Sequence, residues 1–320
     1  MTLVIGTDEA GYGPNLGPLV VAASAWRLDC APADAEEVLE RFGAGAAQAV
    51  PDATLWGDSK EIYRAGTGLA ALERGVLAGL LLANHPLPAD WPALAAAVGA
   101  ISPRPAAHGG STDEQWLGLD RLVLPCATTA AEVHAAAAVA DGLRGARMSL
   151  AAIACRAIYP AEFNALLDRG LNKSDILSQA TLALAAEVCA AAGETPALVW
   201  CDRHGGRKSY AHLVAGHFAA PLVNTLEESP TCSAYAVPSA DLRIEFRVGG
   251  EARLPVALAS MTAKYVRELA MSAFNGFWSA WLPGLAPTAG YPVDAKRWRD
   301  AAAACIQAAG VADDELWRRS

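Results

Sequence analysis

The sequence is poor in charge and contains no closely spaced cysteine pairs. Charged residues make up 18% of its 320 residues, below the usual share of about 25%. Hydrophobic residues make up 53%, which excludes a disordered chain and favours a substantial core. The seven cysteines include no Cys-x-x-Cys pair, and this pattern argues against a disulfide framework and a structural zinc site.

The sequence also lacks a secretory signal and an obvious membrane span. No basic segment precedes the first apolar run, which is only a few residues long. No stretch of about 20 residues is free of charges and turn-forming residues, as a membrane-spanning helix requires. The alanine-rich stretch 130–140 contains Glu132 and His134 and is typical of a soluble helix. We therefore expect a cytoplasmic protein, a monomer, without a membrane partner.

Positive charge is in short supply, with 25 Lys and Arg against 34 Asp and Glu and a formal net charge of −9. A nucleic-acid partner usually leaves a basic footprint, so this count argues mildly against one. Carboxylates that bind divalent cations would add negative charge that the cations neutralise locally. The basic cluster 203–208 lies beside Asp202 and supplies a local positive rim, with a flexible surface turn as the alternative.

The order of apolar runs and turn residues predicts an α/β layered domain. The strands expected from β-branched or alternating runs are 2–7, 19–28, 149–159, 197–201 and 242–248. The expected helices are 33–48, 160–169, 174–193, 255–281 and 294–309. We expect Ser174, or the residues Lys173–Asp175, to cap the helix at 174–193. The segment 84–111 is rich in Pro, Gly and Ala and is interpreted as a loop or insertion.

Acidic residues stand at the ends of two expected strands. Asp8 and Glu9 close an apolar strand and open a glycine turn, and Asp202 follows the apolar run at 197–201. A charge at the end of a buried strand is costly without a partner, which favours a metal site at this edge of the sheet. A solvated turn at 8–9 and a helix N-cap at 202 remain as alternatives.

A third acidic position lies in the long apolar helix expected at 255–281. Ser260, Lys264 and Glu268 follow one another at spacings of four and form one polar stripe. The stripe is either a surface face with a Lys264–Glu268 pair or an acidic face directed at a site. If the separated acids converge, their hard oxygen ligands suit Mg²⁺ or Mn²⁺, and two such ions can clamp a phosphodiester.

Several motifs resemble those of the type 2 ribonucleases H, ribonuclease HII and ribonuclease HIII. The segment from Asp8 through Gly11-Tyr12-Gly13-Pro14 to Val21 resembles the opening signature of ribonuclease HII. The matching elements that follow, in the family's order, are Asp58-Ser59-Lys60, Asn172 with Gln179-Ala180-Thr181-Leu182, Asp202, the stretch from Gly250 through Ala259-Ser260 and Lys264 to Arg267-Glu268, and Gly290-Tyr291.

The resemblance implies a ribonuclease H-like fold, in which helices flank a mixed central sheet, with insertions. The catalytic domain would span 1–285, with insertions at about 61–145 and 206–240, and 286–320 would be a C-terminal helical extension. The implied reaction is endonucleolytic hydrolysis at ribonucleotides in an RNA–DNA hybrid or a ribonucleotide-containing duplex, with two ions of Mg²⁺ or Mn²⁺.

The resemblance also implies roles for individual residues. The four metal-binding and catalytic carboxylates would be Asp8, Glu9, Asp202 and Glu268. The Gly11-Tyr12-Gly13 backbone would lie against the sugar that carries the 2′-hydroxyl. The further substrate-binding residues would be Ser59, Lys60, Arg203, Arg207, Lys264 and Tyr291.

This sequence departs from the family at several positions. Tyr12 stands where ribonuclease HII usually has Arg, which removes a cation near the scissile bond. Glu268 replaces the Asp of ribonuclease HII, and Pro292 follows Tyr291 where Gly is usual. The departures keep two alternatives open, namely an inactive relative that binds nucleic acid and a nuclease of the same fold with a different DNA substrate. His204 is either a proton shuttle or a solvated loop residue.

Overall fold

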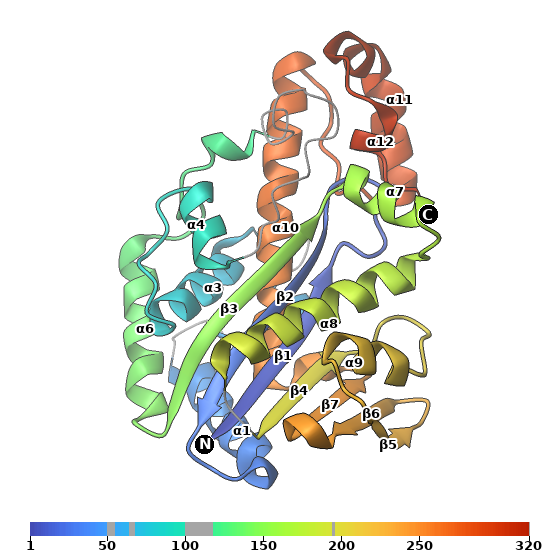
Figure 1. The fold of residues 1–320 in the computed structure, drawn as a ribbon. Helices are drawn as coiled ribbons and strands as arrows, with labels where there is room; N and C mark the ends of the chain where they lie inside the picture. The colour runs from blue at the N-terminus through green and yellow to red at the C-terminus, as the bar shows by residue number, and fades with distance from the viewer. Residues whose placement is uncertain (50–54, 64–67, 100–117, 194–195, 320) are drawn as a thin grey trace.

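Seven strands form one mixed sheet in the part of the chain that the computed structural model describes, residues 1–49, 55–63, 68–99, 118–193 and 196–319 (Figure 1). The strands are β1 (Thr2–Ala10), β2 (Leu19–Leu28), β3 (Met148–Ile158), β4 (Ala197–Asp202), β5 (Asn224–Glu228), β6 (Cys232–Val237) and β7 (Leu242–Arg247). Their order across the sheet is β3-β2-β1-β4-β7-β6-β5.

The strand directions bring three carboxyl ends to one edge of the sheet. β2 is antiparallel to both β1 and β3, whereas β4 is parallel to β1 and β7 is parallel to β4. The chain therefore leaves β1, β4 and β7 at the same edge, which is where sites form in sheets of this kind.

Helices cover both faces of the sheet (Figure 1). The α-helices in the described residues are α1 (Ala35–Ala49), α2 (Ser59–Ile62), α3 (Ala70–Leu82), α4 (Trp91–Ala97), α6 (Ala130–Arg144), α7 (Pro160–Asp168), α8 (Lys173–Ala192), α9 (Ala211–His217), α10 (Leu254–Trp281), α11 (Pro292–Ala309) and α12 (Asp313–Leu316). Short 3-10 helices span Pro32–Asp34, Leu119–Arg121, Pro238–Ala240 and Gly250–Ala252.

Alternation along β1 divides the core into two layers. Val4 packs with α10, whereas its neighbours Leu3 and Ile5 pack with α8 and α9, because successive strand residues point to opposite faces. α8 is long and apolar enough to cross a membrane by length and composition. Half of its most apolar window is buried against the rest of the protein, as in the core helix of a soluble domain.

α10 crosses β1 at a glycine. A Cβ on Gly6 would lie 2.1 Å from the carbonyl carbon of Pro255, so the backbones could not approach so closely with any other residue. The Ser24 hydroxyl donates a hydrogen bond to the Pro255 carbonyl oxygen at 2.7 Å from the neighbouring strand. These contacts fix the start of α10, and its polar stripe then follows the direction of β1.

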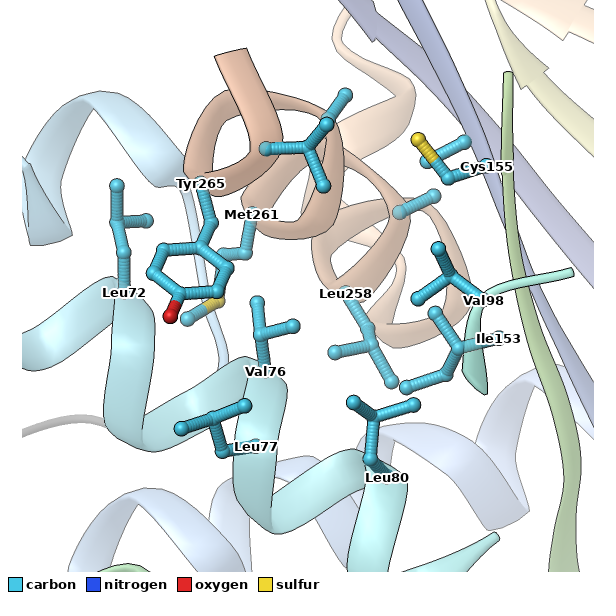
Figure 2. Packing of buried hydrophobic residues seen from close by; sticks show 14 of the residues in the cluster. Leu72, Val76, Leu77, Leu80, Val98, Ile153, Cys155, Leu258, Met261 and Tyr265 are labelled. Atoms are coloured by element: carbon cyan, nitrogen blue, oxygen red, sulfur yellow. The ribbon is translucent and has the colours of Figure 1, made fainter. Parts of the chain in front are cut away.

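The expected insertion at 61–145 contributes helix α3 to the core (Figure 2). Figure 2 shows leucine and valine side chains of α3 against Leu258, Met261 and Tyr265 of α10. The buried Glu73 carboxylate accepts hydrogen bonds from the Tyr265 hydroxyl at 2.8 Å and from the backbone N–H groups of 126–128. This buried acid therefore ties α3 and the loop before α6 to α10.

The predicted α/β class, a mixed central sheet flanked by helices, is confirmed. The interpretation of 84–111 as a loop is wrong for Trp91–Ala97, which forms α4, and residues 100–111 lie outside the described part. The Asp90 side chain caps α4, and a proline is tolerated in a first helical turn. Asn172, rather than Ser174, caps α8 by exchanging hydrogen bonds with Asp175.

Candidate active site

Two acids face each other across neighbouring parallel strands at the edge described above. The register pairs Thr7 with Cys201, so Asp8 and Asp202 lie side by side at the carboxyl ends of β1 and β4. Such strands are about 4.8 Å apart. The Asp8 side chain accepts a hydrogen bond from the Glu9 N–H at 2.8 Å, and it is only 8% exposed. Asp8, Glu9 and Asp202 are therefore brought together as the sequence predicts.

Glu251 is a fourth acid at this edge, and the sequence did not single it out. It lies in the short 3-10 helix that follows β7, and its charge acts on both Asp8 and Asp202. Asp202 Oδ1 accepts a hydrogen bond from the Gly250 N–H at 2.8 Å. A Cβ on Gly250 would lie 3.1 Å from the Asp202 Cα atom, so a glycine permits this approach. The available signal was an acid after two glycines at the end of an alternating strand.

Burial and mutual repulsion raise the pKa values of the carboxylates in this cluster. Burial, followed by the charge of Asp202, raises the pKa of Asp8 to about 7. Burial and then the charge of Asp8 raise the pKa of Glu9, and burial also raises that of Asp202. The acids therefore hold protons that exposed carboxylates would have released, and a cation placed among them would relieve both effects.

The residues present fit a divalent cation by their chemistry. Glu9 Oε2 is buried and, among the described residues, has no hydrogen-bond partner. Carboxylate oxygens are the preferred ligands of Mg²⁺ and Mn²⁺. In the described part of the chain, no three His, Cys, Asp or Glu side chains are already arranged as a metal site. Binding an ion would therefore require side-chain rotation, for example of Glu251 away from Lys60.

Glu268 lies at the far end of the polar stripe. Its carboxylate accepts a hydrogen bond from the Tyr63 hydroxyl at 3.0 Å, and its charge acts on Lys264 and Arg267. Ser260, whose side chain lies beside Asp8, is eight residues earlier in α10. That spacing corresponds to about 12 Å along a helix. Glu251 is therefore the further acid whose charge acts on Asp8 and Asp202, and the role of Glu268 as a metal ligand stays a prediction.

A short segment around α2 supports the acids from the side of α10. The Lys60 ammonium donates a hydrogen bond to Glu251, and the Ser260 hydroxyl donates to the buried Ser59 hydroxyl at 3.0 Å. The Lys264 ammonium lies 4.8 Å from the centroid of the Tyr63 ring and donates to the carbonyl of Tyr63 at 3.3 Å. Lys60 is therefore the exposed cation beside the acids, whereas Lys264 holds α2.

The segment that connects β1 to β2, here called the glycine loop (residues 11–18), borders the acids. Gly11 has φ +86°, which only glycine adopts readily, and a Cβ there would lie 2.5 Å from the Pro18 carbonyl oxygen. The Tyr12 ring lies beneath the Lys173 ammonium, 4.8 Å from its centroid. The 59% exposed Tyr291 lies close enough that a Cβ on Gly13 would be 3.6 Å from its ring.

The basic cluster 203–208 is largely committed to internal contacts. The Arg203 guanidinium donates to the carbonyl oxygens of Arg207 and Ser229. The Arg207 guanidinium pairs with Asp175. His204 is buried, its Nδ1 atom lies 3.0 Å from the Ser178 hydroxyl, and burial lowers its pKa to about 3. Its imidazole is thus neutral near pH 7 and packed inside, which disfavours a role as proton shuttle.

No protein-family model matches this sequence, and no curated protein matches it. Similar solved structures include ribonuclease HII of Archaeoglobus fulgidus, taken from its complex with PCNA. It is 14% identical, with a TM-score of 0.46, and the match covers 98% of this chain and 93% of that one.

Ribonuclease H2 of Pyrococcus horikoshii OT3 is 13% identical, with a TM-score of 0.46 and coverage of 98% and 92%. Bst ribonuclease HIII, solved in complex with Mn²⁺, is 15% identical, with a TM-score of 0.41 and coverage of 99% and 66%. These similarities are weak, and the function proposed below rests on the residues of this chain.

Proposed function

We propose that this chain is a metal-dependent endonuclease that hydrolyses phosphodiester bonds at ribonucleotides, in RNA–DNA hybrids or in duplexes that contain ribonucleotides. The observation that carries this proposal is the meeting of Asp8, Glu9, Asp202 and Glu251 at the carboxyl ends of three parallel strands. The order of motifs that resemble type 2 ribonucleases H supports the same reaction. Cytoplasmic location and a monomeric state remain predictions.

The four acids would hold Mg²⁺ or Mn²⁺, and Glu251 would turn from Lys60 to the ion. When bound, two divalent cations supply Lewis-acid stabilisation of the attacking and leaving oxygens of the phosphodiester. The glycine loop and the exposed Tyr291 ring would position the sugar next to the scissile bond. The exposed Lys60 would attract the phosphate backbone, which partly offsets the negative charge of the chain.

The test uses the purified full chain and three end-labelled duplexes, one with a single ribonucleotide, one RNA–DNA hybrid and one of DNA alone. We expect Mg²⁺- or Mn²⁺-dependent cleavage of the first or second and none in EDTA. Asp8→Asn should abolish it, because a ligand charge is lost. Asp141→Asn, an exposed acid of α6 paired with Arg144, is the matched control and should leave cleavage unchanged.

Other outcomes separate the alternatives. Binding of the duplexes without cleavage, unchanged by Asp8→Asn, would show a binding protein of this fold. Cleavage of a DNA junction, with the ribonucleotide substrates intact, would show a nuclease of different specificity. The first result contradicts the proposed activity, and the second contradicts the proposed substrate class.

A further inference from the structure

Two buried arginines hold the glycine loop from inside the protein. Arg267 of α10 donates hydrogen bonds to the carbonyl oxygens of Pro18 at 2.6 Å and Leu16 at 3.2 Å. Arg318, near the C-terminal end of the chain, donates to the carbonyl oxygens of Gly11 at 2.6 Å and Pro14. The exposed fractions are 5% for Arg267 and 1% for Arg318. Both guanidinium groups therefore lie beneath the loop rather than in solvent.

Keeping these cations buried is costly, because neither forms an ion pair within the described residues. Burial lowers the pKa of Arg267 to about 10 and that of Arg318 to about 9. Arg318 Nε and Nη1 are also buried without a hydrogen-bond partner in the described part of the chain. An apolar side chain would avoid this cost, so the carbonyl contacts to the loop are the specific contribution of Arg318.

The contact to Gly11 sets the orientation of one peptide plane. The bond between Gly11 and Tyr12 is trans, and in a trans peptide the N–H points opposite to the C=O. Since the Gly11 carbonyl points at Arg318, the Tyr12 N–H is directed to the other side of the loop. Glu9, a member of the acid cluster, lies only three residues before Tyr12. The guanidinium thus fixes the direction of a backbone donor in the segment that follows Asp8 and Glu9 in the chain.

The C-terminal tail is itself firmly attached at this place. The Arg318 N–H donates to the Asn15 carbonyl at 2.7 Å, and the Asn15 side chain donates back to the Arg318 carbonyl at 2.9 Å. Asn164 of α7 donates to the carbonyl of Trp317 at 2.8 Å. The last residues of the chain and the glycine loop therefore form one connected structure, although they are about 300 residues apart in sequence.

We propose that Arg318 is a positioning residue of the nuclease reaction, which fixes the Gly11–Tyr12 peptide so that the Tyr12 N–H faces the sugar next to the scissile bond. This inference rests on the proposed function. It makes the C-terminal tail a component of the active site rather than an appended extension. Arg318 acts through the loop and does not touch the substrate.

The test measures kcat and KM of Arg318→Ala in the full chain, with a duplex that contains one ribonucleotide and with saturating Mn²⁺. We expect kcat to fall roughly 100-fold, as when a reacting group is misplaced by about 1 Å, with a much smaller change in KM. Guanidinium chloride at a non-denaturing concentration should restore part of the lost kcat. Methylammonium chloride at equal ionic strength should not. Thermal unfolding of each variant reports the folded fraction.

Arg319→Ala is the matched control, since the Arg319 guanidinium is exposed and pairs with Asp168. It should leave kcat unchanged. If Arg318→Ala does not fold, Arg318→Lys retains the charge and a single donor nitrogen, and it should give a kcat intermediate between wild type and no activity.

An unchanged kcat in a folded Arg318 variant overturns this inference and leaves the proposed function intact. So does a loss that follows the folded fraction and does not respond to guanidinium. Wild-type protein that cleaves no substrate overturns both.

Discussion

The two sides of the glycine loop carry opposite charge, and the protein supplies different hydrogen-bond partners to the charged groups on each side. On one side, Asp8, Glu9 and Asp202 lie so close together that their pKa values rise. On the other side, Arg267 and Arg318 are more deeply buried than Glu9 and Asp202, and backbone carbonyls accept hydrogen bonds from both. The acids are therefore incompletely satisfied by the protein itself, whereas the arginines are held by the chain's own backbone.

This difference distinguishes the acids, which form a candidate binding site, from the arginines, which hold the glycine loop in place. Groups that the protein leaves unsatisfied gain stability from an external partner, here a divalent cation. Groups that donate hydrogen bonds to backbone carbonyls hold the chain in place, and their removal disturbs the fold locally. Removing Arg267 should therefore act mainly on stability, whereas removing an acid should act mainly on metal-dependent turnover.

The largest effect on stability is expected on the arginine side. Arg267→Met removes the donor for three carbonyl oxygens, those of Leu16, Pro18 and Ala289. It should lower the free energy of unfolding by about 3 kcal/mol, because buried carbonyls lose their partners. Urea unfolding measures this change. The exposed Arg297→Met is the control, and an equal loss in both variants would contradict the distinction.

On the acid side, the two candidates for the fourth carboxylate can be compared directly. Glu251→Gln should lower metal-dependent kcat by about 100-fold, or about 2.7 kcal/mol in the barrier, since its charge acts on Asp8 and Asp202. Glu268→Gln should cost less than about tenfold, because its carboxylate pairs with Tyr63. Steady-state kinetics at saturating Mn²⁺ measure both. The reverse order would restore Glu268 as the fourth ligand.

Repulsion among the acids predicts a dependence of stability on pH in metal-free protein. The pKa of Asp8 is about 7 in the folded state against 3.8 ordinarily, so the unfolded chain releases its proton first as the pH rises. Stability is therefore lost between about pH 4 and pH 7.

Asp8→Asn removes this loss. In EDTA the free energy of unfolding of this variant should exceed that of wild type by about 1–3 kcal/mol at pH 8 and equal it near pH 4. Denaturant unfolding at both pH values, with Asp141→Asn beside it, tests the sign. A constant difference at the two pH values would refute the repulsion.

The smallest effect is expected at the exposed cation of the site. Lys60→Met should change the free energy of unfolding by less than about 1 kcal/mol, since the Lys60 side chain is largely exposed. The KM for a duplex should instead rise, and its salt dependence should become shallower by the loss of one phosphate contact. A salt titration of KM measures this. An unchanged slope would place the phosphate backbone elsewhere.

Much of the site could be predicted because the residues next to three of its acids in the sequence identify them as strand ends. Asp8, Glu9 and Asp202 end apolar strands next to glycines, and parallel strands bring such ends together. Glu251 also follows glycines at the end of an expected strand. It joins the other acids only because β7 pairs in parallel with β4, and that pairing depends on residues far apart in the chain. Glu268 stands on the predicted polar stripe, eight residues after Ser260, and its role as a metal ligand stays a prediction.

By itself, the sequence determined five of the seven strands, the helices that flank them and the three acids at the strand ends, since periodicity and turn chemistry are encoded within a few neighbouring residues. It did not predict β5 and β6, which lie in the expected insertion at 206–240. Only the tertiary structure decided that Glu251 joins them, that α3 packs on α10 and that Arg318 supports Gly11. Those contacts join residues far apart in the chain, and no local pattern specifies which distant carbonyl a buried guanidinium will find.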